Sequence, residues 1–396
     1  MKQLVLVLNC GSSSIKFAVI DPQAEITLLS GIIQCIGAAE ANLHYTYQGN
    51  KESKALPRID YRAALQEIMG IIHDLKLDVE IIAVGHRVVH GGEKFTQSVV
   101  INDEVLATVR SCNNLAPLHN PANLLGIEEA WRFFPKLPQV AVFDTAFHQT
   151  MPKHAYVYPI PYKFYERDRI RRYGFHGTSH RFVSHKAAAL LKLPIEQLAL
   201  ITAHLGNGCS AAAVLHGHSV DTTMGLTPLE GLVMGTRSGD IDPGLFSHLA
   251  QNFSYDVKQI TDLLNKESGL RGISCAYSDM RGIENAMQQG EVLATLAFEI
   301  FCYRLAKYIA ALSVPLGRID ALIFTGGIGE NSPLVRARTL QWLHILKFAV
   351  NDRLNQEHGK NSNGIITQAN STVAMVIPTN EELLIAQDTF KEAKRG

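Results

Sequence analysis

The chain lacks an excess of charge of either sign. Its 37 lysines and arginines balance its 37 aspartates and glutamates, and only 19% of its residues are charged. No global field therefore draws the protein to nucleic acid or to an anionic membrane surface, and any site for an anion must be built locally. We accordingly expect neither a nucleic acid nor a membrane as a partner.

Long hydrophobic runs and paired cysteines are missing too. The apolar runs are far shorter than the about 20 residues that a membrane-spanning helix needs, and the N-terminal run, Leu4 to Leu8, lacks the length and the cleavage site of a signal peptide. The six cysteines stand at positions 10, 35, 112, 209, 275 and 302, in no spacing typical of a metal or redox motif. We therefore expect a cytoplasmic protein with free thiols.

Low-complexity segments are also absent, and the chain has the composition of a folded enzyme. Its 396 residues, 46% of them hydrophobic, are enough for two substantial cores. Short β-rich runs alternate with helical patterns, as at Ala122 to Phe134 and Val292 to Leu312, which predicts an α/β fold. No glycine-rich loop is followed by Lys-Ser or Lys-Thr at the spacing of a P-loop, so that nucleotide-binding fold is not supported.

The first twenty residues predict a strand, a tight polar turn and a second strand. In the turn, Gly11 lets the backbone approach a bound group closely, three serines and Lys16 offer donors to an anion, and Asn9 offers an oxygen to a hard cation. A nucleotide phosphate with its Mg²⁺ needs such a loop. An ordinary hairpin, whose glycine and serines merely make the turn, remains an equal alternative at this point.

A second copy of this unit lies about half a chain further on. An apolar run from Leu198 to Thr202 turns through residues 204–210 and resumes from Ala211 to Leu215. Each half also carries a later strand that ends in glycine, Ile81 to Gly85 in the first and Ala321 to Gly327 in the second. A repeat at so long a period predicts two related domains rather than a solenoid, with a ligand cleft between them.

The sequence also predicts where the chain changes domain. Pro152 follows a predicted strand, Gln139 to Phe143, and can continue neither a ladder nor a helix freely, so a hinge is expected at residues 149–152. The closing segment reads as a strand from Val373 to Pro378 that enters a helix capped by Thr379 or Asn380.

Eight segments, taken in order, carry a family resemblance. They are Asn9 to Lys16, His86 to Gly92, Phe143 to Met151, Tyr173 to His180, His204 to Gly208, Gly225 to Pro243, Gly326 to Asn331 and Pro378 to Glu382. Together they resemble the acetate kinase family over essentially the whole chain. The resemblance implies two duplicated ribonuclease-H-like domains of the actin-like ATPase type, with a nucleotide cleft between them, in a homodimer. It further implies an acyl-substrate and phosphate domain at residues 1–148, closed by a C-terminal helix at 383–396, and a nucleotide-binding domain at 149–382.

The implied reaction is the reversible transfer of the γ-phosphoryl group of ATP to acetate, giving acetyl phosphate and ADP, with Mg²⁺ or in its place Mn²⁺. Direct in-line transfer brings two anions together, so the site must neutralise charge, for which arginine is well suited. By resemblance Arg87 contacts acetate, Arg237 and His176 stabilise the transferring phosphoryl group, and Asp144 is the catalytic acid or base. A structural ion pair of one arginine with Asp240 or Asp242 is the alternative.

Asp144 follows a buried-looking strand, which is the usual place for a functional side chain in an open α/β sheet. A small carboxylic acid is already ionised at neutral pH and has no proton to surrender. Our hypothesis is therefore that Asp144 orients Mg²⁺-bound water or an arginine.

The remaining site residues follow from the same resemblance. An apolar wall that limits the size of the acceptor is formed by Val89, Leu118, Phe175 and Pro228, and Mg²⁺ is associated with Asn9 and Glu381. The nucleotide positions are Ser12, Ser14, Lys16, His204, Leu205, Gly206, Asn207, Gly208, Asp279, Met280, Arg281, Gly327, Ile328, Gly329, Glu330 and Asn331. Cys209, where relatives usually have a smaller residue, raises the question of oxidative sensitivity.

Other functions remain open from the sequence. Propionate kinase is the main alternative, because one further methylene alters discrimination by only about 1–3 kcal/mol. An actin-like ATPase would need no acid pocket, and a hydrolase built on Cys209 or Ser210 lacks an elbow motif. His176 and His180 lie four residues apart, as a metal-binding pair on a helix would, but the flanking glycines make a regular helix unexpected there.

Overall fold

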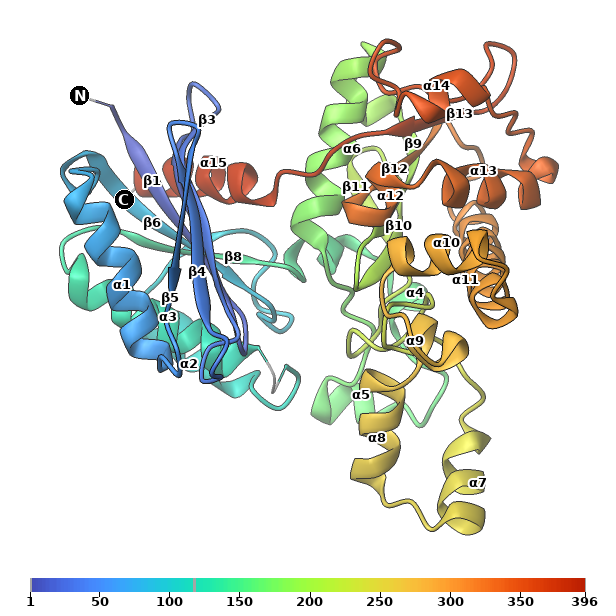
Figure 1. Cartoon of the computed structure of the whole chain (residues 1–396), viewed down its shortest axis with the longest axis horizontal. Coiled ribbons are helices and arrows are strands. Elements are labelled where there is room, and N and C mark those ends of the chain that lie inside the picture. Colours follow the sequence, from blue (N-terminus) through green and yellow to red (C-terminus); the bar gives the residue numbers. More distant parts are fainter. Residues whose placement is uncertain (1, 117–118, 396) are drawn as a thin grey trace. The chain divides into compact units, whose positions relative to one another are not determined.

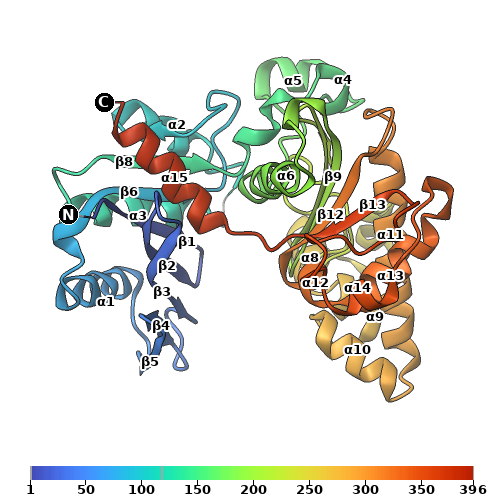
Figure 2. The same cartoon turned by 90° about the horizontal axis from the view of Figure 1, so that it is seen from above.

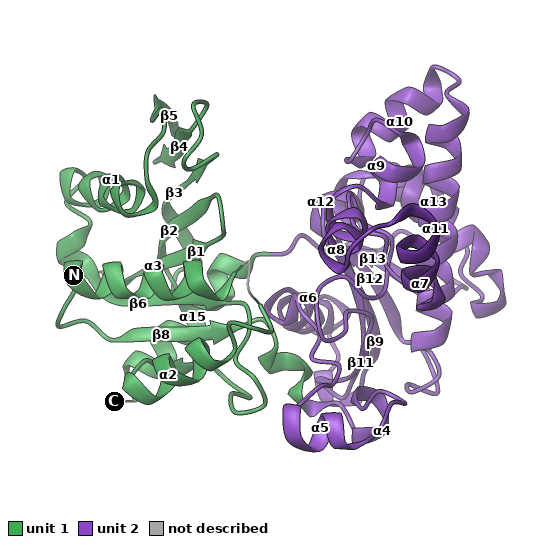
Figure 3. Ribbon diagram, turned by 90° about the horizontal axis from the view of Figure 1, so that it is seen from below, with its two compact units in different colours: residues 1–149, 380–396 green, residues 150–379 purple. Residues whose placement is uncertain are grey.

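The computed structural model describes residues 2–116 and 119–395, which form two compact units (Figure 3). Unit 1 comprises Met1–Gln149 and Asn380–Gly396, and unit 2 comprises Thr150–Thr379, so the chain passes between the units twice. The first passage lies in the segment where the sequence predicts a hinge. The sequence places the second boundary after Glu382, whereas the contacts assign residues 380–382 to unit 1, because Asn380 caps its last helix.

Unit 1 is built on an eight-stranded sheet (Figure 1). Its order is β5-β4-β3-β2-β1-β6-β8-β7, in which β1, β6 and β8 run parallel and all other neighbours run antiparallel. The strands are β1 (Leu4–Cys10), β2 (Ile15–Asp21), β3 (Ile26–Gln34), β4 (Asn42–Tyr47), β5 (Asn50–Ala55), β6 (Ile81–Val88), β7 (Val99–Val100) and β8 (Gln139–Phe143). The carboxyl ends of the three parallel strands therefore meet at one edge, where open α/β sheets bind ligands.

Strand periodicity divides the helices of unit 1 between the two faces of the sheet. Leu4, Leu6 and Leu8 point to one face and pack in a core with α1 (Tyr61–Asp74) and α3 (Asn120–Phe133). Gly85 points to the other face, where it meets the C-terminal helix α15 (Glu381–Ala393), which crosses β6 and β8 in Figure 2. A shorter helix, α2 (Asp103–Ser111), packs against α3. The end of the chain thus covers the sheet begun by its first strand.

Gly85 is predicted to be intolerant of any side chain because α15 lies so close. A Cβ there would come within 2.3 Å of Thr389 Oγ1 and 2.9 Å of Ile385 Cγ2. We expect Gly85→Ala to lower the free energy of unfolding by about 1–3 kcal/mol through overpacking, as measured by urea denaturation. Gly70→Ala is the matched control: nothing lies within 4 Å of that Cβ in α1, so we expect a gain of about 0.5–1 kcal/mol. Equal losses at both sites would contradict this packing.

Unit 2 repeats the topology of unit 1 in a five-stranded sheet of order β11-β10-β9-β12-β13. Its strands are β9 (Ala199–Leu205), β10 (Cys209–Leu215), β11 (His218–Thr222), β12 (Ala321–Thr325) and β13 (Val373–Val376). The hairpin β9-β10 corresponds to β1-β2, and β12 and β13 run parallel to β9 as β6 and β8 run parallel to β1. The predicted duplication of an α/β domain is confirmed.

The helices of unit 2 include both confirmed and corrected predictions. The helical pattern from Val292 to Leu312 is α11 (Val292–Leu312) to the residue, but the expectation that no regular helix surrounds His180 is wrong. His176 adopts a left-handed conformation, with φ at 56°, and the chain becomes helical from Gly177 onward. The other helices are α4 (Lys153–Tyr156), α5 (Lys163–Asp168), α6 (Gly177–Leu191), α7 (Gly244–Phe253), α8 (Val257–Lys266), α9 (Gly269–Ser274), α10 (Met280–Gln288), α12 (Gly326–Asn331), α13 (Pro333–Trp342) and α14 (Asp352–Gln356).

Among the residues that the structure describes, no helix is both long enough and apolar enough to cross a membrane.

Candidate active site

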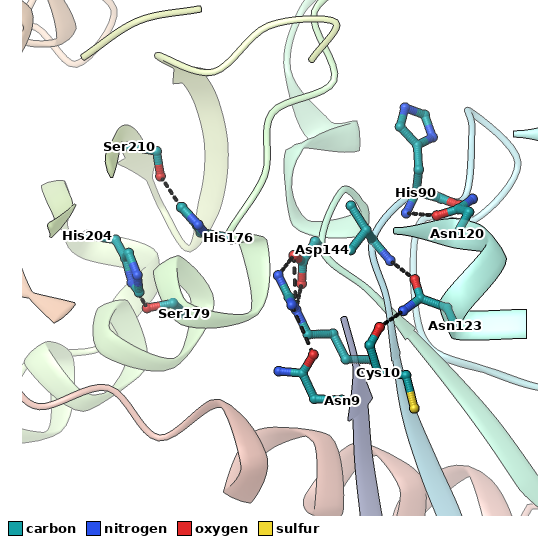
Figure 4. Close-up of polar contacts among 12 residues, drawn as sticks. Asn9, Cys10, His90, Asn120, Asn123, Asp144, His176, Ser179, His204 and Ser210 are labelled. Atoms are coloured by element: carbon teal, nitrogen blue, oxygen red, sulfur yellow. Dashed lines mark hydrogen bonds and ion pairs between the residues drawn. The ribbon is translucent and has the colours of Figure 1, made fainter. Parts of the chain in front are cut away.

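In unit 1, three of the predicted site residues meet at the carboxyl ends of the parallel strands (Figure 4). Arg87 donates from Nε and Nη2 to the Asp144 carboxylate, at 3.1 Å and 2.5 Å, and from Nη1 to Asn9 Oδ1 at 3.0 Å. The three side chains come from the end of β1, the end of β6 and the residue that follows β8. The guanidinium group is therefore held in a fixed plane by two planar partners.

Strand register explains why these side chains meet. Arg87 lies opposite Val142 across the β6-β8 pair, two residues beyond Gly85, so it points to the face that α15 covers. Asp144 continues the alternation of β8, and its N–H donates to Val88 O at 3.0 Å. The alternation that buries one face thus assembles the polar cluster on the other.

The Arg87–Asp144 pair is largely withdrawn from water. The Asp144 side chain is 1% exposed and that of Arg87 is 22% exposed. Burial by itself would lower the pKa of Arg87, but the attraction and hydrogen bonds of Asp144 outweigh it, and the pKa is raised. The expected structural ion pair of an arginine therefore exists, but with Asp144, whereas Asp240 and Asp242 accept hydrogen bonds from the N–H groups of Gly231 and Gly244.

Glu381, the other residue expected at the metal, begins α15 beside this cluster. Burial raises the pKa of its carboxyl group to about 7, although Arg87 and Lys16 favour the charged form, and the negative charges of Asp144 and Glu382 add to the rise. A magnesium ion would relieve this repulsion, and it prefers a few oxygen donors together with substrate phosphates over a complete protein cage. In the described part of the chain, no three His, Cys, Asp or Glu side chains form a metal cage. Asn9 and Glu381 nevertheless offer oxygen atoms, the donor type that magnesium takes.

The raised pKa of Glu381 predicts a pH-dependent stability. The pKa of Glu381 is about 7 in the folded protein and has the ordinary value of 4.5 in the unfolded chain, so the folded protein binds this proton more tightly. The free energy of unfolding therefore falls as the pH rises from 4.5 to about 7. We expect Glu381→Gln to melt at the wild-type temperature at pH 5 and at a higher temperature at pH 8. Glu392→Gln, on the same helix, serves as the control variant. A melting difference between Glu381→Gln and wild type that stays constant with pH would contradict the assignment.

Two buried asparagines of α3, which the sequence analysis did not single out, hold the backbone around the cluster. Asn123 accepts a hydrogen bond from Val89 N at 3.0 Å and donates to Cys10 O at 2.7 Å, and so ties the end of β1 to the segment after Arg87. Asn120 pairs with both backbone groups of His90 (Figure 4). Their spacing of three residues, in the run Asn-Pro-Ala-Asn at residues 120–123, is the sequence signal that could have identified them.

The loop between β1 and β2 has the predicted form. Gly11 N donates to Ser14 O at 2.8 Å, which closes the turn that contains Ser12. Lys16 lies opposite Asn9 across the hairpin and contributes to the electrostatic environment of Glu381. The expected phosphate-contacting residues of unit 1 therefore share one end of the sheet with the Arg87 cluster.

In unit 2, His176 and Arg237 converge where Gly208 has no side chain. A Cβ built on Gly208 would lie 3.6 Å from His176 Nε2 and 3.6 Å from Arg237 Nη1. Arg237 also donates to Pro228 O at 3.2 Å, and burial lowers its pKa. Glycine thus leaves space beside the His176 ring and the Arg237 guanidinium group, which suits an anion if both groups donate to it.

A network of histidines and hydroxyls supports His176 from behind. Its Nδ1 lies 2.9 Å from Ser210 Oγ, its ring stacks on that of His204 at 4.4 Å between centroids, and His204 Nδ1 lies 2.8 Å from Ser179 Oγ (Figure 4). His180 is also linked to Ser210, through Nε2 at 2.8 Å. The histidines that the sequence left open as a metal pair thus share a serine hydroxyl.

A pocket of unit 2 has a volume of about 520 Å³ and gathers half of the expected nucleotide residues. Glu284 and Ser332, which the sequence did not indicate, also line it, and Ser332 donates a hydrogen bond to Glu284. The expected residues in its lining are Gly206, Asn207, Asp279, Met280, Arg281, Gly327, Ile328 and Asn331. The short helix α12 and the start of α10 therefore present backbone and polar groups to one space.

Several expected residues have other surroundings. Leu205, Gly329 and Glu330 are not among the described lining residues of this pocket, and Glu330 Oε1 accepts hydrogen bonds from Gly326 N and Thr379 N. Its carboxylate therefore fastens the start of α12 to the end of unit 2. Cys209 is fully buried and burial raises its pKa to about 12, so the suggested oxidative sensitivity finds no support in its environment.

The residues of the expected apolar wall are divided between the two units. Val89 is buried in unit 1, Phe175 is buried in unit 2, and Pro228 is half-buried there next to Arg237. Leu118 lies outside the described residues.

Comparison with known proteins gives a consistent result. The model of the acetokinase family matches residues 4–387. Acetate kinases of Shewanella sp. W3-18-1 and Shewanella putrefaciens are each 56% identical over 392 residues, covering 98% of both chains. Among solved structures, a propionate kinase from Francisella tularensis is similar at a TM-score of 0.94 and 46% identity, and the acetate kinase of Porphyromonas gingivalis at 0.91 and 42%; each comparison covers 98% of this chain and 99% of the other.

Proposed function

The chain belongs to the acetokinase family, and from that premise we propose that it transfers the γ-phosphoryl group of ATP to acetate, forming acetyl phosphate and ADP. The observation that carries the proposal is the convergence of His176 Nε2 and Arg237 Nη1 on the space above Gly208. Two donors that border one space can stabilise the charge that develops on a phosphoryl group during its transfer. The transfer would be direct and reversible.

We assign roles to the units by the same reasoning. Unit 1, with Arg87 held by Asp144 and Asn9, would bind the carboxylate of acetate, and the pocket of unit 2 would bind the nucleotide. Asn9 and Glu381 would hold magnesium, which supplies charge neutralisation at the phosphates. The protein is further proposed to act in the cytoplasm as a homodimer.

The relatives leave the choice of acid to experiment, because both acetate and propionate kinases are among the similar structures. The acetate kinases at 56% identity favour acetate. Incubation with Mg²⁺-ATP, hydroxylamine and acetate, propionate, butyrate or no acid should give acyl hydroxamate most rapidly with acetate, and little ADP without acid. A preference for propionate would reassign the substrate, and acid-independent ADP release would point to an ATPase of this fold.

Val89 is the residue of the expected wall for which the structure provides the clearest test. It follows the Arg87 strand directly, its N–H is fixed by Asn123, and its side chain is buried. We expect Val89→Ala to raise kcat/KM for propionate relative to acetate by roughly 10-fold, since a methylene in an apolar pocket is worth about 1–3 kcal/mol. Val99→Ala, on β7, is the control. An unchanged ratio would remove Val89 from the acceptor wall.

A further inference from the structure

Behind His176, a chain of hydrogen bonds runs from Thr202 on β9 to the candidate site. Thr202 Oγ1 lies 2.7 Å from His180 Nδ1, His180 Nε2 lies 2.8 Å from Ser210 Oγ, and Ser210 Oγ lies 2.9 Å from His176 Nδ1. Thr202, His180 and Ser210 are each 0% exposed, whereas His176 is only half-buried. The chain of bonds thus leads from the core of unit 2 to a histidine that is partly exposed.

The direction of these bonds is set at the buried end. Within the described structure, Thr202 Oγ1 is hydrogen-bonded to His180 Nδ1 alone. If the buried Thr202 hydroxyl accepted this bond, its own proton would have no acceptor in the core. Thr202 therefore donates, and His180 Nδ1 accepts. A neutral His180, the form that burial favours, then carries its proton on Nε2.

The directions of the remaining hydrogen bonds follow because each hydroxyl has only one proton to donate. His180 Nε2–H donates to Ser210 Oγ, which leaves the single proton of Ser210 for His176 Nδ1. A neutral His176 that accepts at Nδ1 must carry its proton on Nε2, the atom that lies with Arg237 Nη1 around Gly208. The opposite tautomer would present a lone pair there and repel an anionic oxygen.

We propose that Thr202, His180 and Ser210 are positioning residues that fix His176 as the neutral Nε2–H tautomer, a hydrogen-bond donor toward the bound phosphoryl group. The tautomer itself is independent of the proposed function, and only its kinetic consequence rests on that function. In this arrangement the buried Thr202, which is separated from His176 by the side chains of His180 and Ser210, determines whether His176 Nε2 can donate a hydrogen bond.

The test is a long-range ¹H–¹⁵N spectrum of protein labelled with ¹⁵N-histidine. In the wild type we expect His176 and His180 each to show a protonated Nε2 and an unprotonated Nδ1. Thr202→Val keeps the β-branched shape but removes the donor, so His180 and then His176 should populate the other tautomer. Thr339→Val, a buried threonine of α13 outside this chain of bonds, is the control and should leave the His176 signals unchanged.

Kinetics supply the second measurement. We expect Thr202→Val to lower kcat by about 10-fold to 100-fold, as changes in partners that orient a ligating histidine do, with KM for ATP changed less than about twofold. Should Thr202→Val fail to fold, Ser210→Ala removes the last donor and should release the His176 tautomer in the same spectrum.

A wild-type His176 protonated on Nδ1, or a His176 spectrum that Thr202→Val and Ser210→Ala leave unchanged, would overturn the proposal. Because the spectrum needs no turnover, a protein without acetate kinase activity would refute the proposed function and leave this test intact. Normal hydroxamate formation by a protein whose His176 is protonated on Nδ1 would support the proposed function and refute the proposal about the tautomer.

Discussion

Arg237→Ala is expected to lower kcat by at least about 10³-fold, the loss seen when an arginine that stabilises phosphoryl transfer is removed. The described hydrogen bonds of the Arg237 guanidinium go to Pro228 O and Met234 Sδ, neither of which is an anion, and burial lowers its pKa. Its charge is thus partly desolvated, and none of its hydrogen-bond partners in the described part of the chain carries a counter-charge. An arginine without a counter-charge stabilises the negative charge that develops on a transferring group more strongly than an arginine already neutralised by a carboxylate does.

The comparison with lysine separates charge from geometry. Arg237→Lys retains the positive charge but loses the planar fork, so we expect most of the loss in kcat to remain. Arg338→Ala is the control, because Arg338 pairs with Glu299 on α11 and lines neither site. Steady-state kinetics with acetate and with ATP provide the measurement. A loss of less than about 10-fold for Arg237→Ala would assign phosphoryl stabilisation to another group.

The parts of the fold that the sequence predicted are those governed by local patterning. The strand Gln139–Phe143 and the helix Val292–Leu312 match to the residue, because each is a continuous apolar or periodic run with clear ends. The start of α6 was missed because Gly174 and Gly177, which flank His176, disfavour a helix by propensity, whereas the chain becomes helical from Gly177 onward, directly after His176 at a φ of 56°. From the sequence alone, a glycine that begins a helix cannot be distinguished from a glycine that prevents one.

The same distinction applies to the candidate site. Arg87 and Asp144 could be selected from the sequence because each lies at the end of an apolar run, yet their mutual pairing depends on β6 and β8 being adjacent, which only the sheet order reveals. Ser210 sits within an ordinary apolar strand, β10, and its links to His176 and His180 arise because α6 packs against the sheet of unit 2. Residues that act through other residues leave little trace in a single sequence.

Asp144→Asn is expected to lower kcat by about 100-fold or more, because the loss of a bidentate clamp misplaces Arg87. The carboxylate now accepts from both Nε and Nη2 of Arg87, and an amide presents only one oxygen, with its NH₂ group facing a donor. If Asp144 orients Arg87 and transfers no proton, the pH profile of the variant keeps the acid limb of the wild type at a reduced height.

A double variant, Arg87→Lys with Asp144→Asn, tests the same role of Asp144 without a pH profile. Arg87→Lys removes the same fork from the other side, so Asp144→Asn should add little to the loss already caused by Arg87→Lys. Two deletions that act on one interaction are not additive, whereas a separate proton transfer by Asp144 would make the losses multiply. Multiplicative losses, together with the disappearance of the acid limb in Asp144→Asn, would restore Asp144 as a general acid or base.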